Sequence, residues 1–159
     1  MVLVLLGTQS HSFIRLLDEI EDCIKKNVIT SAVIVQHGHT KFSSNYMELF
    51  DFIPIEEFNN LIAKADLIIT HGGVGSIINS IKIHKKVIAV PRLSEFNEHV
   101  NNHQIEIVDT FNNLGLIKGV FDVTLLCDAI KSINTFKPVP YISNNKGMLK
   151  IVKDYIDNN

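Results

Sequence analysis

The chain has 159 residues, of which 46% are hydrophobic and 20% charged, and its formal net charge is -2 at pH 7. This length suffices for one globular domain that buries roughly two thirds of its unfolded surface, so we expect residues 1–159 to form a single domain. The balanced charge excludes a general attraction to nucleic acid or to anionic lipid. The apolar stretch at residues 2–6 ends at Gly7, far short of the roughly 20 residues that span a bilayer, so we expect a cytoplasmic protein.

Short apolar runs alternate with segments of helical periodicity along the whole chain. The runs are rich in β-branched residues and predict buried strands, whereas the apolar spacing between them predicts amphipathic helices. Because parallel neighbours need helical crossovers, we predict an α/β fold. It is a Rossmann-like, doubly wound, mostly parallel sheet of about six strands with helices on both faces. The expected strands are residues 2–6, 31–36, 49–53, 67–69, 87–90 and 116–117; the expected helices begin near Phe13, Ile55 and Ser76 or span 100–113, 123–133 and, as a terminal helix, about 145–157.

The two cysteines, Cys23 and Cys127, are far apart in the sequence and lack the spacing of metal ligands. We therefore expect ordinary buried or half-buried thiols in a reducing compartment, without a redox or catalytic role.

A glycine-rich loop follows the strand expected at residues 67–69. Gly72, Gly73 and Gly75 allow a sharp turn and a close approach of another molecule to the backbone. The helix after them offers unpaired N–H groups and a partial positive charge, so strand, loop and helix together form a potential phosphate seat. A plain structural turn is the alternative, since the spacing matches neither the dinucleotide fingerprint nor a P-loop with its lysine.

Polar residues also gather at other loops of the same sheet edge. Gly7 and Thr8 follow the first strand, and two small-residue loops can flank one diphosphate. Residues 92–104 are dense in amides, carboxylates and imidazoles, which suits a ligand with many hydroxyls such as a sugar. A solvated loop with a helix cap is the alternative.

Two other chemistries receive less support. His99 and His103, with Glu95 four residues earlier, share a helix face on which a metal could bind, but a closed zinc site needs four ligands. We therefore expect no metal. A serine or cysteine in a nucleophile elbow is also missing, so covalent hydrolase chemistry is unsupported.

Combined and in this order, these motifs resemble the carboxyl-terminal, sugar-nucleotide-binding half of inverting GT-B glycosyltransferases of family 28. The chain looks like the short donor-binding subunits of two-component capsule and exopolysaccharide UDP-sugar glycosyltransferases. It is also similar to the small subunit of the transferase that adds N-acetylglucosamine to a dolichol-linked sugar. The resemblance covers nearly the whole chain, with motifs at residues 4–8, 13, 15–16, 52–54, 65–76, 90–92, 98–99 and 102–104.

The resemblance implies a role for each matching position. Many relatives have a glutamate at the position of Asn79, where it binds ribose hydroxyls, and an amide there brings no charge. The diphosphate and its nucleoside would meet Gly7, Thr8, Gly72, Gly73, Gly75, Ser76 and Asn79; uracil would lie against Phe52 and Ile53; the sugar side would be Glu98, His99, Asn102, His103 and Gln104.

The resemblance also implies the activity, a UDP-sugar-dependent hexosyl transfer to a lipid-linked acceptor by a single inverting displacement. The setting would be capsule or exopolysaccharide biosynthesis. No Asp-x-Asp motif is present, so neither a cofactor nor a metal is expected. A complete GT-B enzyme has two such domains, so a membrane-anchored partner resembling the amino-terminal half would supply the acceptor site and the catalytic base. That partner would recruit the chain to the inner face of the cell membrane.

Two alternatives stay open at this point. The chain could be a non-catalytic, nucleotide-binding enhancer subunit of such a transferase, or a metal-dependent hydrolase that uses His99 and His103. The terminal helix at about 145–157 has one apolar side, which suits core packing or, as the second interpretation, docking to the partner or a membrane surface.

Overall fold

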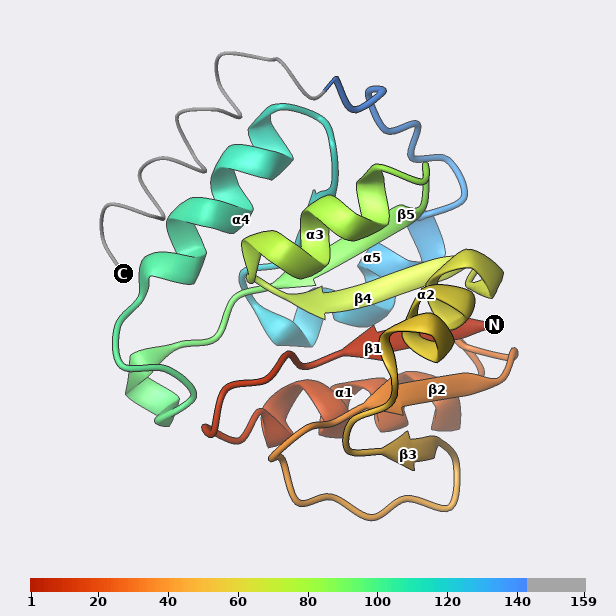
Figure 1. Cartoon of the computed structure of the whole chain (residues 1–159), viewed down its shortest axis with the longest axis vertical. Coiled ribbons are helices and arrows are strands. Elements are labelled where there is room, and N and C mark those ends of the chain that lie inside the picture. The colour runs from red at the N-terminus through yellow and green to blue at the C-terminus, as the bar shows by residue number, and fades with distance from the viewer. Residues whose placement is uncertain (143–159) are drawn as a thin grey trace.

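The computed structural model describes residues 1–142. Within them, six strands form one sheet in the order β3-β2-β1-β4-β5-β6 (Figure 1). Every neighbouring pair is parallel, which confirms the doubly wound α/β sheet that the sequence predicts. The strands are β1 Val2–Leu5, β2 Val33–Gln36, β3 Glu48–Phe50, β4 Leu67–His71, β5 Lys86–Val90 and β6 Lys118–Gly119.

Helices cover both faces of the sheet (Figure 1). The helices α1 and α5 pack together on one face, and α2, α3 and α4 pack on the other. Their bounds are α1 Ile14–Lys25, α2 Ile55–Lys64, α3 Val74–Ile81, α4 His103–Asn113 and α5 Leu126–Ser132, with short 3-10 turns η1 Ser94–Phe96 and η2 Val123–Leu125.

The alternation of side chains along each strand builds two cores. In β1, Val2 and Val4 pack into the core under α1 and α5, whereas Leu3 and Leu5 pack under the other three helices. All four side chains are buried, which is why this strand reads as a continuous apolar run rather than as an alternating one.

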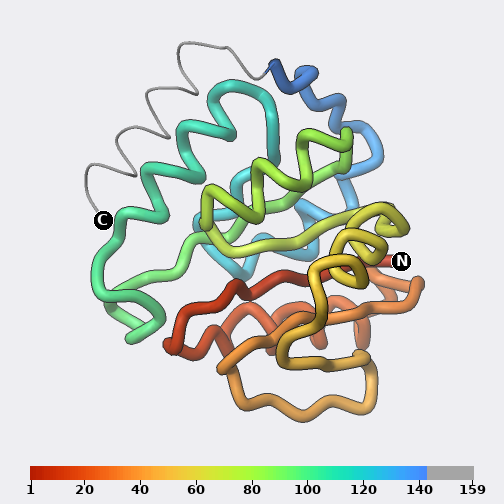
Figure 2. Tube along the Cα trace, in the orientation of Figure 1, coloured from red at the N-terminus to blue at the C-terminus, as the bar shows by residue number. Residues whose placement is uncertain are grey.

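The chain reverses direction in the sheet between β1 and β4. It first runs outward from β1 to β3 and then returns to the other side of β1 to add β4, β5 and β6 (Figure 2). The loops after β1 and β4 therefore lead away in opposite directions. Ligands of such sheets bind in the crevice that this reversal leaves beyond the carboxyl ends of the strands.

Several boundaries differ from those expected. The helix expected near Ser76 begins at Val74, directly after Gly73, and the one expected at 100–113 begins at His103. Residues 94–102 instead form a 3-10 turn and a hydrogen-bonded loop. The last strand is residues 118–119 rather than 116–117, because only the former pair with β5. The terminal helix expected at about 145–157 lies outside the described residues.

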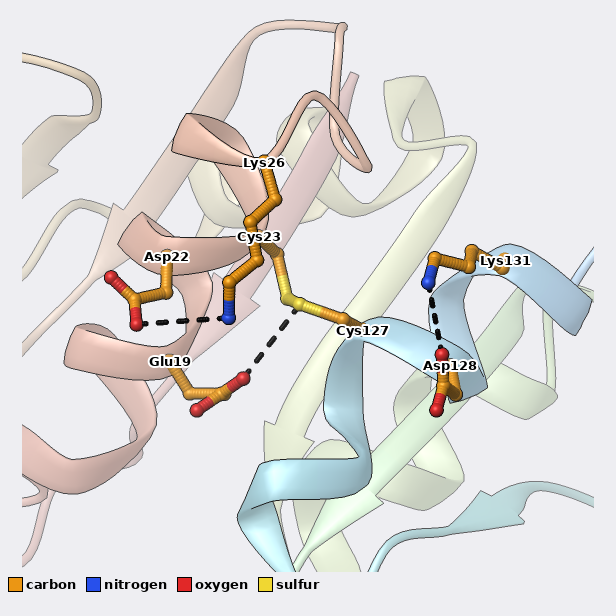
Figure 3. Close-up of a disulfide and its surroundings, with 7 residues drawn as sticks. All are labelled: Glu19, Asp22, Cys23, Lys26, Cys127, Asp128 and Lys131. Atoms are coloured by element: carbon orange, nitrogen blue, oxygen red, sulfur yellow. Dashed lines mark hydrogen bonds and ion pairs between the residues drawn. A yellow bond between two sulfur atoms is a disulfide. The ribbon is translucent and has the colours of Figure 1, made fainter.

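The expectation of free cysteine thiols is wrong. Both cysteines are buried, as expected, but Cys23 and Cys127 form a disulfide whose Cα atoms are 5.5 Å apart (Figure 3). The sequence separation of 104 residues hides this proximity, which arises because α1 and α5 pack on the same face of the sheet. The cysteines therefore no longer support the prediction of a reducing compartment.

The surroundings of the disulfide are polar at the surface. Glu19 Oε1 lies 3.7 Å from Cys127 Sγ, and since a disulfide sulfur carries no proton this is a contact rather than a hydrogen bond (Figure 3). Burial raises the pKa of Glu19 above its usual value.

Among residues 1–142 no helix is long and apolar enough to cross a membrane.

Candidate functional site

A cavity of about 960 Å³ opens at the carboxyl ends of the strands, at the reversal between β1 and β4. The loops after β1, β3, β4 and β5, the last residues of β2 and β4, and parts of three helices line it. Its walls are formed by Gly7, Thr8, Gln9, Gln36, Phe52, Ile53, Ile55, Phe58, His71, Gly72, Gly73, Val74, Gly75, Ser76, His99, Asn101, Asn102, His103, Gln104, Glu106 and Ile107.

The first turn of α3 borders this cavity as a candidate anion seat. Gly73 is the N-cap residue, and no side chain caps the helix. The first N–H groups of a helix have no partner within it, and together they carry about half a positive charge. A Cβ atom at Gly75 would meet nothing within 4 Å, so the approach to this turn is open.

Gln104 fixes the loop that leads into α3. Its side-chain Oε1 accepts hydrogen bonds from the backbone N–H of Gly72 at 2.9 Å and of Arg92 at 3.1 Å. The side chain is buried, and it joins the first turn of α4 to the ends of β4 and β5. Gln104 therefore shapes the glycine loop, a role that differs from the sugar contact implied by the resemblance.

His71, the last residue of β4, lies between the two glycine loops. A Cβ atom at Gly73 would lie 2.2 Å from His71 Nε2, and one at Gly7 would lie 2.6 Å from the same atom. Gly7 also has a φ of +76°, which disfavours other residues. The imidazole thus requires a glycine at both positions. His71 is not among the site residues predicted from the sequence.

The environment of His71 keeps its imidazole neutral. Burial, and after it the positive charge of Arg92, lower the pKa of His71 from 6.5 to about 4. Nδ1 lies 3.3 Å from the carbonyl oxygen of Leu5 and 3.3 Å from Thr70 Oγ1. Because a carbonyl only accepts, the ring proton belongs on Nδ1, which leaves Nε2 as an acceptor beside Gly7 and Gly73.

His99 joins two of the loops that line the cavity. Its Nδ1 accepts from the backbone N–H of Asn101 at 3.2 Å, so the proton of the neutral ring lies on Nε2. The Gln9 side-chain amide lies 3.0 Å from Nε2, and it can accept this proton with its oxygen when the amide is turned accordingly. Burial lowers the pKa of His99, which favours this neutral form.

The opposite end of the cavity is apolar and aromatic. Phe52 and Ile53 follow β3, and Ile55 and Phe58 come from the first turns of α2. Phe52 is 48% exposed and makes an edge-to-face contact with His39 at a centroid distance of 5.3 Å. A partly exposed aromatic wall of this kind suits the flat face of a nucleobase.

Two expected site residues do not line the cavity. Asn79 is exposed on α3, one turn beyond Ser76. Glu98 is 3% exposed, and its carboxylate is bound to Arg15 and to the backbone N–H of Leu93. Its expected contact with a sugar is therefore replaced by a structural role. The other expected residues, Gly7, Thr8, Phe52, Ile53, Gly72, Gly73, Gly75, Ser76, His99, Asn102, His103 and Gln104, all line the cavity.

Several lining residues are not among the site residues predicted from the sequence. Gln36 ends β2 as a buried polar residue after three apolar ones, which is a usable indication of a site. Phe58 is an apolar residue of a helix, and only the position of α2 beside the cavity shows that it also lines the site. Gln9 and Asn101 neighbour expected residues and would have been found by extending each motif.

The alternative of a metal site at His99 and His103 has no set of three ligands among residues 1–142. His99, His103 and Glu95 do not bring three ligand atoms together, and His103 Nδ1 is instead 3.3 Å from Glu106 Oε2. In residues 1–142, three side chains that could together bind a metal ion are those of Glu19, Cys23 and Cys127. The two cysteines form the disulfide, and they cannot act as thiolates while bonded.

Fold and site together define a Rossmann-like α/β module with a candidate anion seat and an aromatic wall on one cavity. The sequence pattern described as "Glycosyltransferase family 28 C-terminal domain" matches residues 1–158, and the chain belongs to this family. The family expected from the sequence is thereby confirmed.

Curated relatives and solved structures agree with this membership. The UDP-N-acetylglucosamine transferase subunit ALG13 of Candida glabrata is 35% identical over 103 residues, which cover 64% of this chain and 44% of that protein. The subunit of the same name from Debaryomyces hansenii is 27% identical over 158 residues, covering 88% and 72%. The chain thus spans about half the length of the first of these relatives. The NMR solution structure of ALG13 superimposes with a TM-score of 0.60 at 17% identity, covering 94% of this chain and 93% of that one, which supports the fold alone.

Proposed function

We propose that this chain is the donor-binding subunit of a two-component inverting glycosyltransferase that uses a UDP-sugar. The observation that carries the proposal is the uncapped first turn of α3, which faces the Gly7–Thr8 loop across one cavity. A diphosphate between these loops would receive backbone N–H groups and the positive end of the helix dipole. Family membership and the similarity to transferase subunits support the same assignment.

The two ends of the cavity give the donor a direction. The nucleobase would lie against Phe52 and Phe58, and the sugar would extend toward the amides and imidazoles at Asn101, Asn102 and His103. Polar side chains in fixed positions suit a ligand with many hydroxyls. The diphosphate would then lie between them, at the anion seat.

The reaction that follows from this placement is a single displacement at the anomeric carbon. As the sugar–phosphate bond breaks, negative charge grows on the leaving UDP, and the N–H groups of α3 would stabilise it without reorganisation. The acceptor hydroxyl attacks from the opposite side. His71 is a weak base because its pKa is lowered to about 4. Nδ1 of His99 accepts from a backbone N–H while Nε2 carries the ring proton. We therefore assign the base that removes the hydroxyl proton to the partner subunit.

The finer parts of the proposal concern the partner and the pathway. We propose a membrane-anchored subunit that resembles the other GT-B half, binds a lipid-linked acceptor and holds this chain at the inner face of the membrane. No cofactor or metal is assigned to the donor site. Because the curated relatives are named as UDP-N-acetylglucosamine transferase subunits, UDP-N-acetylglucosamine is the first donor to test. A capsule or exopolysaccharide pathway has no support from these names.

The proposal is tested by binding first and transfer second. Isothermal titration of the purified chain with uridine, UDP and UDP-N-acetylglucosamine should show that the diphosphate supplies most of the affinity, with UDP at least about tenfold tighter than uridine. Equal affinity for uridine and UDP would contradict the anion seat.

Transfer is then measured with the candidate partner, a lipid-linked acceptor and radiolabelled donor. Sugar transfer that needs both chains supports the donor-binding subunit. Binding of UDP without transfer of any sugar, in a mixture whose partner is shown to hold the acceptor, would favour the non-catalytic enhancer subunit instead.

A further inference from the structure

The loop between β5 and α4 is held from outside by one side chain of α1. This loop, residues 91–102, carries His99, Asn101 and Asn102 to the cavity. Glu98 turns away from the cavity, and its carboxylate receives two hydrogen bonds from Arg15: Nε to Oε1 at 2.9 Å and Nη2 to Oε2 at 2.8 Å. The geometry is bidentate, which makes the pair directional as well as charged.

Arg15 grips the loop at three points. In addition to the Glu98 carboxylate, its Nη2 donates to the carbonyl oxygen of Pro91 at 3.1 Å. The exposed ring of Phe96 lies over its guanidinium at 4.8 Å, and the buried ring of Phe13 lies at 5.4 Å. One guanidinium thus contacts the loop at its start, at its 3-10 turn and at the residue before His99, through Pro91, Phe96 and Glu98.

The loop also has hydrogen bonds of its own, among them those from the Glu98 N–H to the carbonyl oxygen of Leu93 at 3.1 Å and from the Ser94 N–H to Asn102 Oδ1 at 2.8 Å. Its regular structure is one 3-10 turn, followed by Asn97 in the left-handed region at a φ of 55°. Within the loop, Arg92 donates to the carbonyl oxygen of Glu98 at 3.1 Å, and from outside it Gln9 lies 3.0 Å from His99 Nε2. Arg92 is fully buried and also binds the carbonyl oxygens of Leu6 and His11, so it belongs to the core.

We infer that Arg15 is a positioning residue for the sugar end of the donor. It touches no part of the cavity, but through Glu98 it fixes the loop on which His99, Asn101 and Asn102 lie. Groups held in place before binding lose less entropy when the ligand arrives. The anion seat on α3 is supported separately by Gln104 and His71, so Arg15 affects the sugar more than the UDP. This inference rests on the proposed function, because it needs a sugar nucleotide in the cavity.

The first test needs no ligand. Hydrogen–deuterium exchange of Arg15→Met should speed up the amides of residues 93–102 while those of α3 stay as in the wild type. Arg15→Lys, which keeps the charge but not the bidentate fork, should give an intermediate effect. The matched control is Lys25→Met, which removes an ion pair with Glu21 at the other end of the same helix, and it should change neither segment.

The second test separates sugar from UDP. Titration of Arg15→Met with UDP and with UDP-N-acetylglucosamine should leave UDP affinity within about threefold and lower the affinity ratio of sugar nucleotide to UDP by about tenfold. Glu98→Gln should give a similar loss. The double variant should be no worse than the more affected single variant, because both remove one interaction.

The outcomes divide cleanly. Equal loss of both ligands, or an unchanged affinity ratio despite a loosened loop, would overturn the positioning role and leave the proposed function intact. If the wild-type chain binds neither UDP nor UDP-N-acetylglucosamine, the proposed function fails together with this inference, even where the exchange data show that Arg15 holds residues 93–102.

Discussion

At the scale of single residues, His71 explains more of the site than the glycines that the sequence makes prominent. Gly7 and Gly73 both face its ring at distances too short for a Cβ atom. The imidazole thus joins the ends of β1 and β4, where the crevice of the sheet opens. A neutral ring fits this place, since a charged one would be desolvated beside the positive charge of Arg92.

His71 should make the fold less stable in acid. The pKa of about 4 in the folded chain lies below the 6.5 of an unfolded histidine, so the unfolded state binds more protons between these values. Stability present above pH 6.5 is therefore lost as the pH falls toward 4, by at most about 3 kcal/mol. Urea denaturation at pH 6.5 and 4.5 should show a smaller loss for His71→Asn, whose amide can still donate to Leu5. The control His84→Asn, at an exposed turn, should keep the wild-type loss. Equal pH dependence of His71→Asn and wild type would contradict this assignment.

Gln104 should affect both halves of the donor. Because its Oε1 holds the N–H groups of Gly72 and Arg92, Gln104→Ala leaves two buried donors unpaired. We expect a loss of about 2 kcal/mol or more in the free energy of unfolding, and weaker binding of UDP as well as of UDP-N-acetylglucosamine. Denaturation and calorimetric titration measure the two effects. Loss of the sugar nucleotide alone, with UDP binding intact, would return Gln104 to a direct contact with the sugar.

At the scale of elements, the first turn of α3 offers one position where the anion seat can be tested without disturbing the fold. Gly75 is exposed, and a side chain there meets nothing within 4 Å, whereas a Cβ atom at Gly73 would strike the His71 ring. Gly75 is therefore the informative glycine of the loop, although Gly73 looks equivalent in the sequence.

Gly75→Asp should abolish UDP binding while the domain stays folded. A carboxylate at a helix N-terminus is favourable for the helix, but it would occupy the place of the phosphate and repel it. We expect UDP affinity to fall by at least about 100-fold in calorimetric titration, equivalent to about 3 kcal/mol. The neutral, similarly shaped Gly75→Asn should lose much less. Equal losses for Asp and Asn would show that space rather than charge governs the position, and intact binding in Gly75→Asp would refute the seat.

The elements also show what the sequence can and cannot reveal. Strands such as β1 and β5 are predictable because burial on both faces makes them unbroken apolar runs, and their loops then fall at one edge by topology alone. The start of α4 was predicted too early because the loop after β5 takes its form from Arg15 and Arg92, whose partners are 76 or more residues away in several cases. Periodicity within a window carries no trace of such contacts. For the same reason the sequence does not indicate that His71 lines the cavity, and it does not indicate that Glu98 binds Arg15 instead of a sugar.

At the scale of the whole molecule, α1 links features that the sequence keeps apart. Its first turn holds the loop at the cavity through Arg15, and its last part is joined to α5 through Cys23. The helices α1 and α5 cover the face of the sheet opposite to α3 and α4, so the disulfide stabilises the scaffold from the far side of the glycine loop (Figure 1).

Reduction of the disulfide should therefore lower stability without abolishing binding at the anion seat. The bond closes a loop across 104 residues of sequence separation, and breaking such a link typically costs about 2–4 kcal/mol through the larger freedom of the unfolded chain. Urea denaturation of the wild type with and without reductant measures this loss, and thiol alkylation with mass spectrometry confirms the redox state. The double variant Cys23→Ala with Cys127→Ala should match the reduced protein, and reductant should not change its stability.

UDP affinity should stay within about twofold on reduction, because the helix dipole and loop N–H groups of α3 are unchanged. It is measured without urea, at a temperature at which each form is folded. Free alkylation of both thiols in protein that was never reduced would contradict the bond itself, and loss of UDP binding on reduction would show that α1 and the glycine loop are coupled across the sheet.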